Sequence, residues 1–247
     1  MKNFIAANAS DYQNPFAPPG RYSLENIKIL LNAQIENSIK LGWEPKDIIV
    51  VANFVHKFME VETIRMKFND YCYLGSNTFG MKYLFDNDMV DDVIWSHDLD
   101  AWQNVELEIP KFKDVGIAYS LNDSLEYQYN TASVFWRENT KDIIDSIVFF
   151  IEKYKIDREE PPTNVVLKSE IYKDRVTIIN PTYNLGCFHY DIRRKMCTHP
   201  IQVCHFHPDR EIHWQKQILN SEKFKDKGIT DRLENLLRRY FPHLPNS

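Results

Sequence analysis

Two acidic residues, separated by one position, follow an apolar segment near the middle of the chain. We expect residues 93–96 (Val-Ile-Trp-Ser) to form a buried strand, which leads through His97 into Asp98, Leu99 and Asp100. Two carboxylates at the end of a buried strand concentrate negative charge, which is costly unless a cation is bound there. Such oxygen ligands suit Mg²⁺ or Mn²⁺, above all when the ion also contacts a diphosphate. The alternative interpretation is a turn or a helix cap, because an isolated Asp-x-Asp is a weak signal.

Two histidines are candidates for a third ligand. His205 and His207 are two positions apart, so on a strand their side chains lie on the same face. Imidazole binds Mn²⁺-like ions and can donate to phosphate. Zinc is an alternative, because this part of the chain is rich in possible zinc ligands: His189, Cys197, His199, Cys204, His205, His207 and His213. These residues do not have the Cys-x-x-Cys or His-x-x-x-His spacing that is typical of zinc sites.

The segments that precede the acidic pair alternate between strand and helix patterns. The apolar runs predict strands at residues 3–7, 47–54, 71–74 and 93–96. Ser23 is a good N-cap for a helix over residues 24–39, helical turns are expected within 56–68, and a helix is expected over 78–88. This order predicts a parallel α/β sheet with helices on both faces. Ligands of such sheets bind beyond the carboxyl ends of the strands, where the acidic pair lies.

The second half of the chain is less regular. Strands are expected at residues 115–120, 132–136, 175–179 and 201–207, and helices at 142–155, 210–219 and 230–240. The charged segment 158–163, which two prolines interrupt, is expected to be a loop over the site. The chain contains no repeat and no linker of biased composition, so we predict a single domain over residues 1–247.

Composition excludes several classes of protein. The chain has 247 residues, of which 43% are hydrophobic, and a net charge of −5, so it is neither disordered nor fibrous. A protein that coats nucleic acid is usually basic, so the negative net charge argues against that class. The cluster Arg193-Arg194-Lys195 is interpreted as a solvated face, but contact with an anionic acceptor, including nucleic acid, stays open as a less favoured alternative. Four cysteines without a framework pattern, and no apolar stretch of about 20 residues, predict a soluble cytoplasmic protein without a membrane span.

The motifs occur in the order found in GT-A fold glycosyltransferases. Residues 79–85 followed by 93–100 resemble the helix and Asp-x-Asp strand of the group related to glycogenin and to bacterial lipopolysaccharide galactosyltransferases. Residues 129–135 resemble the Asn-Ala-Gly strand of that group, 176–184 its later strand, and 203–206 its closing His strand. The resemblance implies a GT-A-like, Rossmann-like and mostly parallel sheet flanked by helices. It also implies a nucleotide-binding half over residues 1–100, and an acceptor-side half with C-terminal helices over 101–247.

The resemblance implies a function for each motif. The enzyme would be a metal-dependent glycosyltransferase that moves a sugar from a nucleotide diphosphate, UDP-sugar above all, to a glycan or another hydroxyl acceptor. Asp98 would hold the donor ribose and the Mn²⁺ or Mg²⁺ ion, and Asp100 would bind the ion directly. His205 would be the third protein ligand, with His207 as the alternate.

Further residues would hold the donor. By the same resemblance, Lys82 would contact the donor phosphate or sugar, and Asn130 would line the sugar pocket. The loop from Asn8 to Tyr12 would hold the nucleoside, with Tyr12 as a stacking platform.

The catalytic base and the stereochemical outcome stay open. Four residues are candidate bases, although each is more typical of a solvated surface: Asp123, Asp157, Glu159 and Glu160. Three alternative functions remain. One is a viral-type glycosyltransferase that modifies DNA bases, and another is a noncatalytic protein that binds nucleotide sugars. The third is a metal-dependent hydrolase, which would need further ligands near the first strand, where Asp11 is the obvious candidate.

Overall fold

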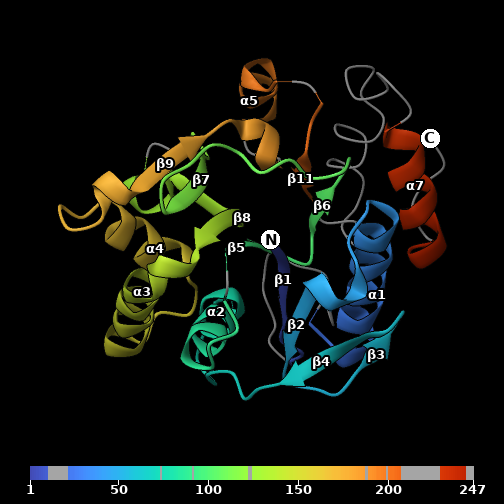
Figure 1. The fold of residues 1–247 in the computed structure, drawn as a ribbon, viewed down its shortest axis with the longest axis horizontal. Coiled ribbons are helices and arrows are strands. Elements are labelled where there is room, and N and C mark those ends of the chain that lie inside the picture. The colour runs from blue at the N-terminus through green and yellow to red at the C-terminus, as the bar shows by residue number, and fades with distance from the viewer. Residues whose placement is uncertain are drawn as a thin grey trace.

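The structure is a computed structural model that describes residues 1–10, 22–72, 74–90, 92–121, 124–186, 189–198, 200–206 and 229–242. An eight-stranded sheet in the order β3-β4-β2-β1-β5-β8-β7-β9 forms its centre, and a three-stranded sheet in the order β10-β11-β6 lies beside it (Figure 1). The strands are β1 (Lys2–Ala7), β2 (Ile48–Ala52), β3 (Lys57–Phe58), β4 (Val61–Arg65), β5 (Val93–His97), β6 (Ala101–Gln103), β7 (Val115–Tyr119), β8 (Tyr129–Arg137), β9 (Val176–Ile179), β10 (Leu185–Gly186) and β11 (Val203–His205).

The large sheet is mostly parallel, as the sequence predicts. β1 pairs in parallel with β2 on one side and β5 on the other, and β2–β4 and β7–β9 are also parallel pairs. Only β3 and β8, among the described strands of this sheet, run opposite to their neighbours. Strands from the second half of the chain therefore extend the sheet that the first half begins, and the predicted α/β fold class is confirmed.

Helices cover both faces of the large sheet. The helices are α1 (Leu24–Lys40), α2 (Ser76–Asp86), α3 (Lys141–Tyr154), α4 (Glu160–Leu167), α5 (Tyr190–Met196) and α7 (Ile229–Tyr240), and short 3₁₀ turns lie at η1 (Pro45–Asp47), η2 (Leu125–Tyr127), η3 (Glu138–Thr140), η4 (Lys173–Arg175) and η5 (Pro181–Tyr183). Successive β1 side chains alternate between the faces. Ile5 packs with Leu31 of α1, whereas Phe4 packs with Leu84 of α2. In Figure 1, α2, α3 and α4 lie together on one side and α1 on the other.

The small sheet is held against α1 by the C-terminal helix. Leu233 and Leu237 of α7 are fully buried, in one cluster with Trp102 of β6. Arg232 donates to the side-chain oxygen of Asn37 on α1 and to the backbone carbonyls of Gln103 and Asn104. These contacts join β6, which follows directly after the Asp-x-Asp segment, to both α1 and α7, which also pack against each other (Figure 1).

Three local predictions are wrong. Residues 56–68, expected to contain helical turns, contain the β3–β4 hairpin, in which β3 is the edge strand of the sheet and β4 pairs with β2. Residues 71–74 form no strand in the described part of the chain, where Leu74 makes an isolated bridge to Arg158. Residues 158–163 were expected to be a loop, but Glu160 begins α4 and the two prolines lie in its first turn, where no intrahelical donor is needed. The expected helix at 210–219 lies outside the described residues.

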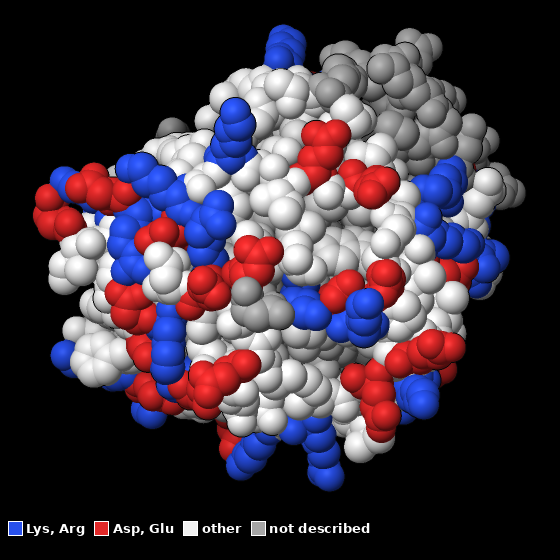
Figure 2. All heavy atoms as spheres, viewed as in Figure 1, with Lys and Arg blue, Asp and Glu red and all other residues white. Residues whose placement is uncertain are grey.

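The basic cluster near residue 193 is not a solvated face. Arg193 is fully buried and Arg194 is 9% exposed, whereas Lys195 is exposed. Figure 2 shows basic and acidic side chains interspersed on the face that it draws, which gives no support for a broad phosphate-binding surface there. In the described part of the chain, no helix combines the length and apolar character needed to cross a membrane.

Candidate functional site

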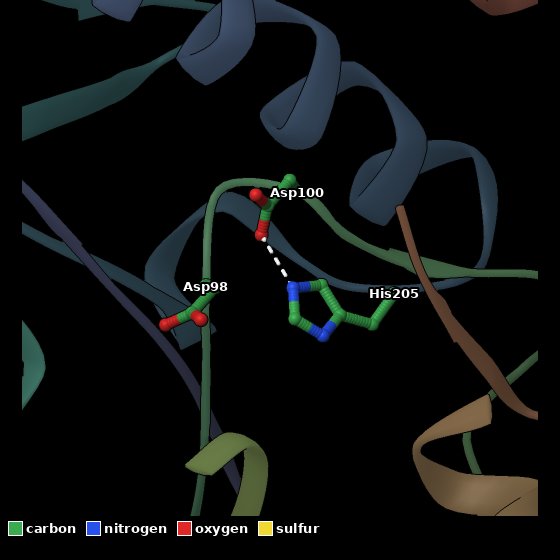
Figure 3. A group of neighbouring side chains, drawn as sticks. All are labelled: Asp98, Asp100 and His205. Carbon is green, nitrogen blue, oxygen red and sulfur yellow. Dashed lines mark ion pairs between the residues drawn. The ribbon is translucent and has the colours of Figure 1, made fainter. Parts of the chain in front are cut away.

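The structure brings Asp98, Asp100 and His205 together. One ligand atom from each of these side chains lies within 4.8 Å of the others, and His205 Nε2 is 3.2 Å from Asp100 Oδ1 (Figure 3). The strand pairing explains the convergence: β11 is antiparallel to β6, and His205 is paired with Ala101, the residue that follows Asp100. The acidic turn therefore leaves β5 at the carboxyl edge of the large sheet and meets a histidine from about 100 positions later in the chain.

Hydrogen bonds fix the backbone of the acidic turn. Gln34 of α1, which is buried, donates its amide to the carbonyls of Leu99 and Ala101 at 2.8 and 3.0 Å. The Phe206 amide donates to the carbonyl of Asp100 at 2.9 Å. These contacts connect α1 and β11 to the turn, so the two carboxylates and the imidazole are mounted on one rigid unit.

His97 supports the same turn from below. Its ring is fully buried and stacks on Trp95 with the ring centroids 4.0 Å apart. Nδ1 lies 3.0 Å from the carbonyl oxygen of Asp98, and Nε2 lies 2.8 Å from the side-chain oxygen of Asn3. Burial lowers the pKa of His97 to about 4, so the imidazole is neutral at pH 7. Both partners are acceptor oxygens, and a neutral ring donates a proton to one of them.

The electrostatics of the group favour a cation. Burial raises the pKa of Asp98 well above its ordinary value, and the nearby charge of Asp100 raises it further. Burial disfavours a charged imidazole at His205, but the carboxylates of Asp100, Asp98 and Glu160 outweigh this effect and raise the pKa of His205. A bound divalent ion would offset the repulsion between the carboxylates. Two carboxylates and one imidazole fit Mn²⁺ or Mg²⁺ as ligands.

Thiolates do not contribute to this group among the described residues. Cys204 is next to His205 in sequence, but it is fully buried, and its sulfur accepts a hydrogen bond from the Asn104 amide at 2.9 Å. Burial raises the pKa of the Cys197 thiol to about 11, so it is protonated at pH 7. A cysteine-based zinc site therefore finds no support in the described part of the chain.

Two glutamates near the group were expected to be surface charges and are not. Glu159 is 6% exposed and accepts hydrogen bonds from the Thr78 amide and hydroxyl at 2.9 and 2.8 Å. Burial raises the pKa of both Glu159 and Glu160 to about 7, and the His205 imidazole partly lowers that of Glu160. The Glu160 carboxylate has no hydrogen-bond or ion-pair partner among the described residues. The two prolines that follow Glu160 were the sequence signal for this environment, because prolines in this position mark the start of a helix rather than a loop.

A cavity opens beside the carboxyl ends of β1, β2 and β4. It has a volume of about 660 Å³, and its lining includes Asn8, Asn53, Arg65 and Asp70. The Asn53 amide makes two hydrogen bonds to the backbone of Ala9, one as donor at 2.7 Å and one as acceptor at 2.9 Å. Asn53 therefore extends the β1–β2 pairing past the end of the strands and fixes the loop in which Asn8 lies. Tyr12, the predicted stacking platform, lies outside the described residues.

The remaining predicted residues divide into two groups. Asn130 lies on β8 close to the acidic turn: its side-chain oxygen accepts from the Ala132 amide, and the Ala132 carbonyl accepts from the Asp98 amide. Lys82 is not brought to the group, because its ammonium lies 2.9 Å from both Asp86 and Asp145, between α2 and α3. The expected contact of Lys82 with the donor therefore finds no support in this geometry.

Other candidates lie at the surface or outside the described residues. Asp157 pairs with its neighbour Arg158 at 3.0 Å. His207, the alternate ligand, and Asp123 and Asp11 are outside the described residues. Trp102, two positions after Asp100, is fully buried against Phe206 and does not line the group.

The fold is similar to that of solved glycosyltransferases. The structure of the galactosyltransferase LgtC in complex with donor and acceptor sugar analogs matches with a TM-score of 0.59 at 12% identity, over 100% of this chain and 97% of that one. GlyE of Streptococcus pneumoniae TIGR4 matches with a TM-score of 0.56 at 11% identity, over 98% and 64% of the two chains. A glycosyltransferase involved in glycosylation of the major capsid of PBCV-1 matches with a TM-score of 0.52 at 9% identity, over 95% and 100%.

Sequence comparison alone finds no such similarity. No protein-family model and no curated protein sequence matches the chain. At identities of 9 to 12% the structural matches establish the fold and leave the chemistry to be derived from the site. The chain therefore has the GT-A fold of glycosyltransferases, in an arrangement that resembles the LgtC group.

Proposed function

We propose that this protein is a metal-dependent glycosyltransferase that transfers a sugar from a nucleotide diphosphate to a hydroxyl acceptor. One observation carries the proposal: two carboxylates and an imidazole converge within 4.8 Å at the carboxyl edge of the sheet. The cavity lined by Asn8 lies at the same edge, and the GT-A fold supports this use of the edge. UDP-sugar is our first choice of donor, and the acceptor is a glycan or another hydroxyl compound.

The residues of this chain divide the task. Asp98, Asp100 and His205 would hold Mn²⁺ or Mg²⁺, which when bound acts as a Lewis acid toward the leaving diphosphate. Asn8 and the cavity beside it would hold the nucleoside, and Asn130 would line the sugar pocket. Rigid hydrogen bonds at the acidic turn keep the ligands in place before the donor arrives, so little reorganisation is needed during the reaction.

Glu160 is our candidate for the carboxylate that acts at the reacting sugar. The charges of His205 and Arg158 act on its carboxylate, and among the described residues no side chain forms a hydrogen bond or an ion pair with it. A pKa of about 7 suits a group that must accept a proton near neutral pH. Glu159, which has a similar pKa, is already engaged by Thr78 and is the weaker candidate.

Thermal stability with and without ligands tests the proposal. We expect UDP, GDP or TDP to raise the melting temperature only when Mn²⁺ is present, because a ligand that binds only the native state stabilises it. At 100 times the dissociation constant the gain is about 2.7 kcal/mol, or roughly 5–10 °C for a chain of this size. Asp100→Ala should abolish the response, whereas Asp174→Ala, a matched change at an exposed aspartate, should keep it.

Two other outcomes would contradict the proposal. Stabilisation by Mn²⁺ that no nucleotide increases would favour a metal-dependent hydrolase. Stabilisation by a nucleotide that neither Mn²⁺ nor Asp100→Ala changes would favour a noncatalytic binding protein.

A further inference from the structure

Asn77, the second residue of α2, makes a short contact with Asp98, one of the candidate metal ligands. Its side-chain amide donates to Asp98 Oδ1 at 2.6 Å. Its side-chain oxygen accepts from the backbone amide of Ala6 at 3.2 Å. The paired residues of β1 and β5 end at Ile5 and His97. Asn77 therefore bridges the two strands at the point where β5 leaves the sheet, and its amide orientation is fixed by Ala6.

Close packing brings α2 near enough for this bridge. A side chain at Gly80 would place its Cβ 2.6 Å from the Phe4 ring, so glycine allows α2 to approach β1. A Cβ at Gly75 would lie 2.3 Å from the Cys72 sulfur, so the N-cap position of α2 also requires glycine. A glycine N-cap has no side chain with which to cap the helix.

Glu159 supplies the missing cap from another part of the chain. Its carboxylate accepts hydrogen bonds from the amide and the hydroxyl of Thr78, which is the residue after Asn77. The first turn of α2 is therefore held on one side by β1 and on the other by the segment that leads into α4. Both contacts are buried, and both act on the turn that carries Asn77.

We propose that Asn77 is a positioning residue for the metal ion: it binds one carboxylate oxygen of Asp98 and thereby aims the other at the cation. Glu159 acts one step further away, by holding the helix turn on which Asn77 lies. A hydrogen bond from a neutral amide leaves Asp98 its charge and fixes its rotamer, as outer partners of metal-binding carboxylates do.

This inference rests on the proposed function, because it presumes that Asp98 binds a divalent ion. The test is the affinity of the purified full-length chain for Mn²⁺ alone, measured by isothermal titration calorimetry. Asn77→Asp keeps the shape of the side chain and replaces the donor by an acceptor that repels Asp98. We expect it to weaken Mn²⁺ binding by about 10–100-fold, which is the usual cost of losing an outer partner of a metal ligand. Asn77→Ser, which is smaller and uncharged, should weaken binding by at least several-fold.

A matched control lies at the other end of the same helix. Asn87 follows α2 and donates its amide to the Tyr83 carbonyl, so Asn87→Asp makes the same change of charge away from the site. Its Mn²⁺ affinity should stay within about twofold of the wild type. The melting temperature of each variant without Mn²⁺ shows whether it is folded, and Asn77→Ser gives the result if Asn77→Asp does not fold.

The possible results are distinct. Loss of Mn²⁺ affinity in folded Asn77 variants, with Asn87→Asp unchanged, supports the positioning role. Wild-type affinity in a folded Asn77→Ser overturns it and leaves the metal site in place. A wild-type chain that does not bind Mn²⁺ overturns both the inference and the proposed function.

Discussion

Replacing Asp98 by asparagine should stabilise the metal-free protein and abolish its response to metal. At the 4.8 Å limit between ligand atoms, two unit charges in an effective dielectric of about 20 repel by roughly 3.5 kcal/mol. His205 lies 3.2 Å from Asp100 and offsets part of this repulsion when it is protonated. We therefore expect Asp98→Asn to stabilise the metal-free chain by about 1–3 kcal/mol, which is roughly 2–12 °C in melting temperature for this size.

The assay is differential scanning calorimetry at pH 8, with EDTA in one series and Mn²⁺ in the other. The wild type should melt below Asp98→Asn in EDTA and gain stability with Mn²⁺, whereas the variant should not respond to Mn²⁺. An asparagine at this position can still accept the hydrogen bond from Asn77, so the comparison isolates the charge. Asp174→Asn, at an exposed aspartate, makes the same change of charge and should alter neither series by more than about 1 °C.

The opposite pattern would refute the interpretation of this group as a cation site. If Asp98→Asn destabilised the protein in EDTA and responded to Mn²⁺ as the wild type does, Asp98 would be a structural capping residue. That is the alternative which the sequence alone left open.

Three further predictions concern the elements that hold the site. Glu36 accepts hydrogen bonds from three donors on α1 and α7, which outweigh its burial and lower its pKa from 4.5 to about 2. In urea titrations at pH 7, Glu36→Gln should be less stable than the wild type by about 1–3 kcal/mol. As the pH falls from 4.5 to 2, the free energy of unfolding should decrease less in Glu36→Gln than in the wild type. Asn53→Ala should weaken binding of UDP with Mn²⁺ by several-fold in calorimetry, because the loop beside the cavity loses two hydrogen bonds. Arg232→Ala, which removes one bond from α7 to α1 and two from α7 to the β6 region, should destabilise the chain by about 2–4 kcal/mol in urea titration.

The sign for Glu36 follows from the lowered pKa. A carboxyl group that is more acidic in the folded state stabilises the protein above its ordinary pKa of 4.5, and that stabilisation is lost as the pH falls toward 2. Glutamine does not titrate, so this part of the acid unfolding should disappear. An unchanged acid limb in Glu36→Gln would show that the contacts with α7 are not formed in solution.

Strong local patterns made the core of the fold predictable. β1, β2 and β5 are short apolar runs that are buried on both faces, and α1 has a clear period and a serine cap whose side chain accepts from the Asn26 amide. The position of Asp98 and Asp100 followed from β5, because the end of a parallel strand defines the ligand edge. The resemblance in motif order to GT-A glycosyltransferases predicted that His205 would be the third ligand of the ion, and the β6–β11 pairing places it beside Asp98 and Asp100.

Tertiary contacts decided what the sequence could not show. Lysine, methionine and glutamate in residues 57–62 favoured a helix, but pairing of β4 with β2 overrides that propensity. From the sequence, Glu159 is expected to lie in a charged surface segment. In the structure it is buried, because α2 packs against it and the Thr78 amide donates to its carboxylate. Arg193 is buried although it lies in a basic run. The partner of Glu159 is 81 positions away in sequence, so local composition gives the wrong environment there.

A crystal soaked with Mn²⁺ and UDP tests the central claim most directly. An anomalous difference peak bonded to Asp98, Asp100 and His205, with the diphosphate on the same ion and the uridine beside Asn8, is the predicted result. A diphosphate bound elsewhere, or Mn²⁺ absent from these three side chains at saturating concentration, would contradict it.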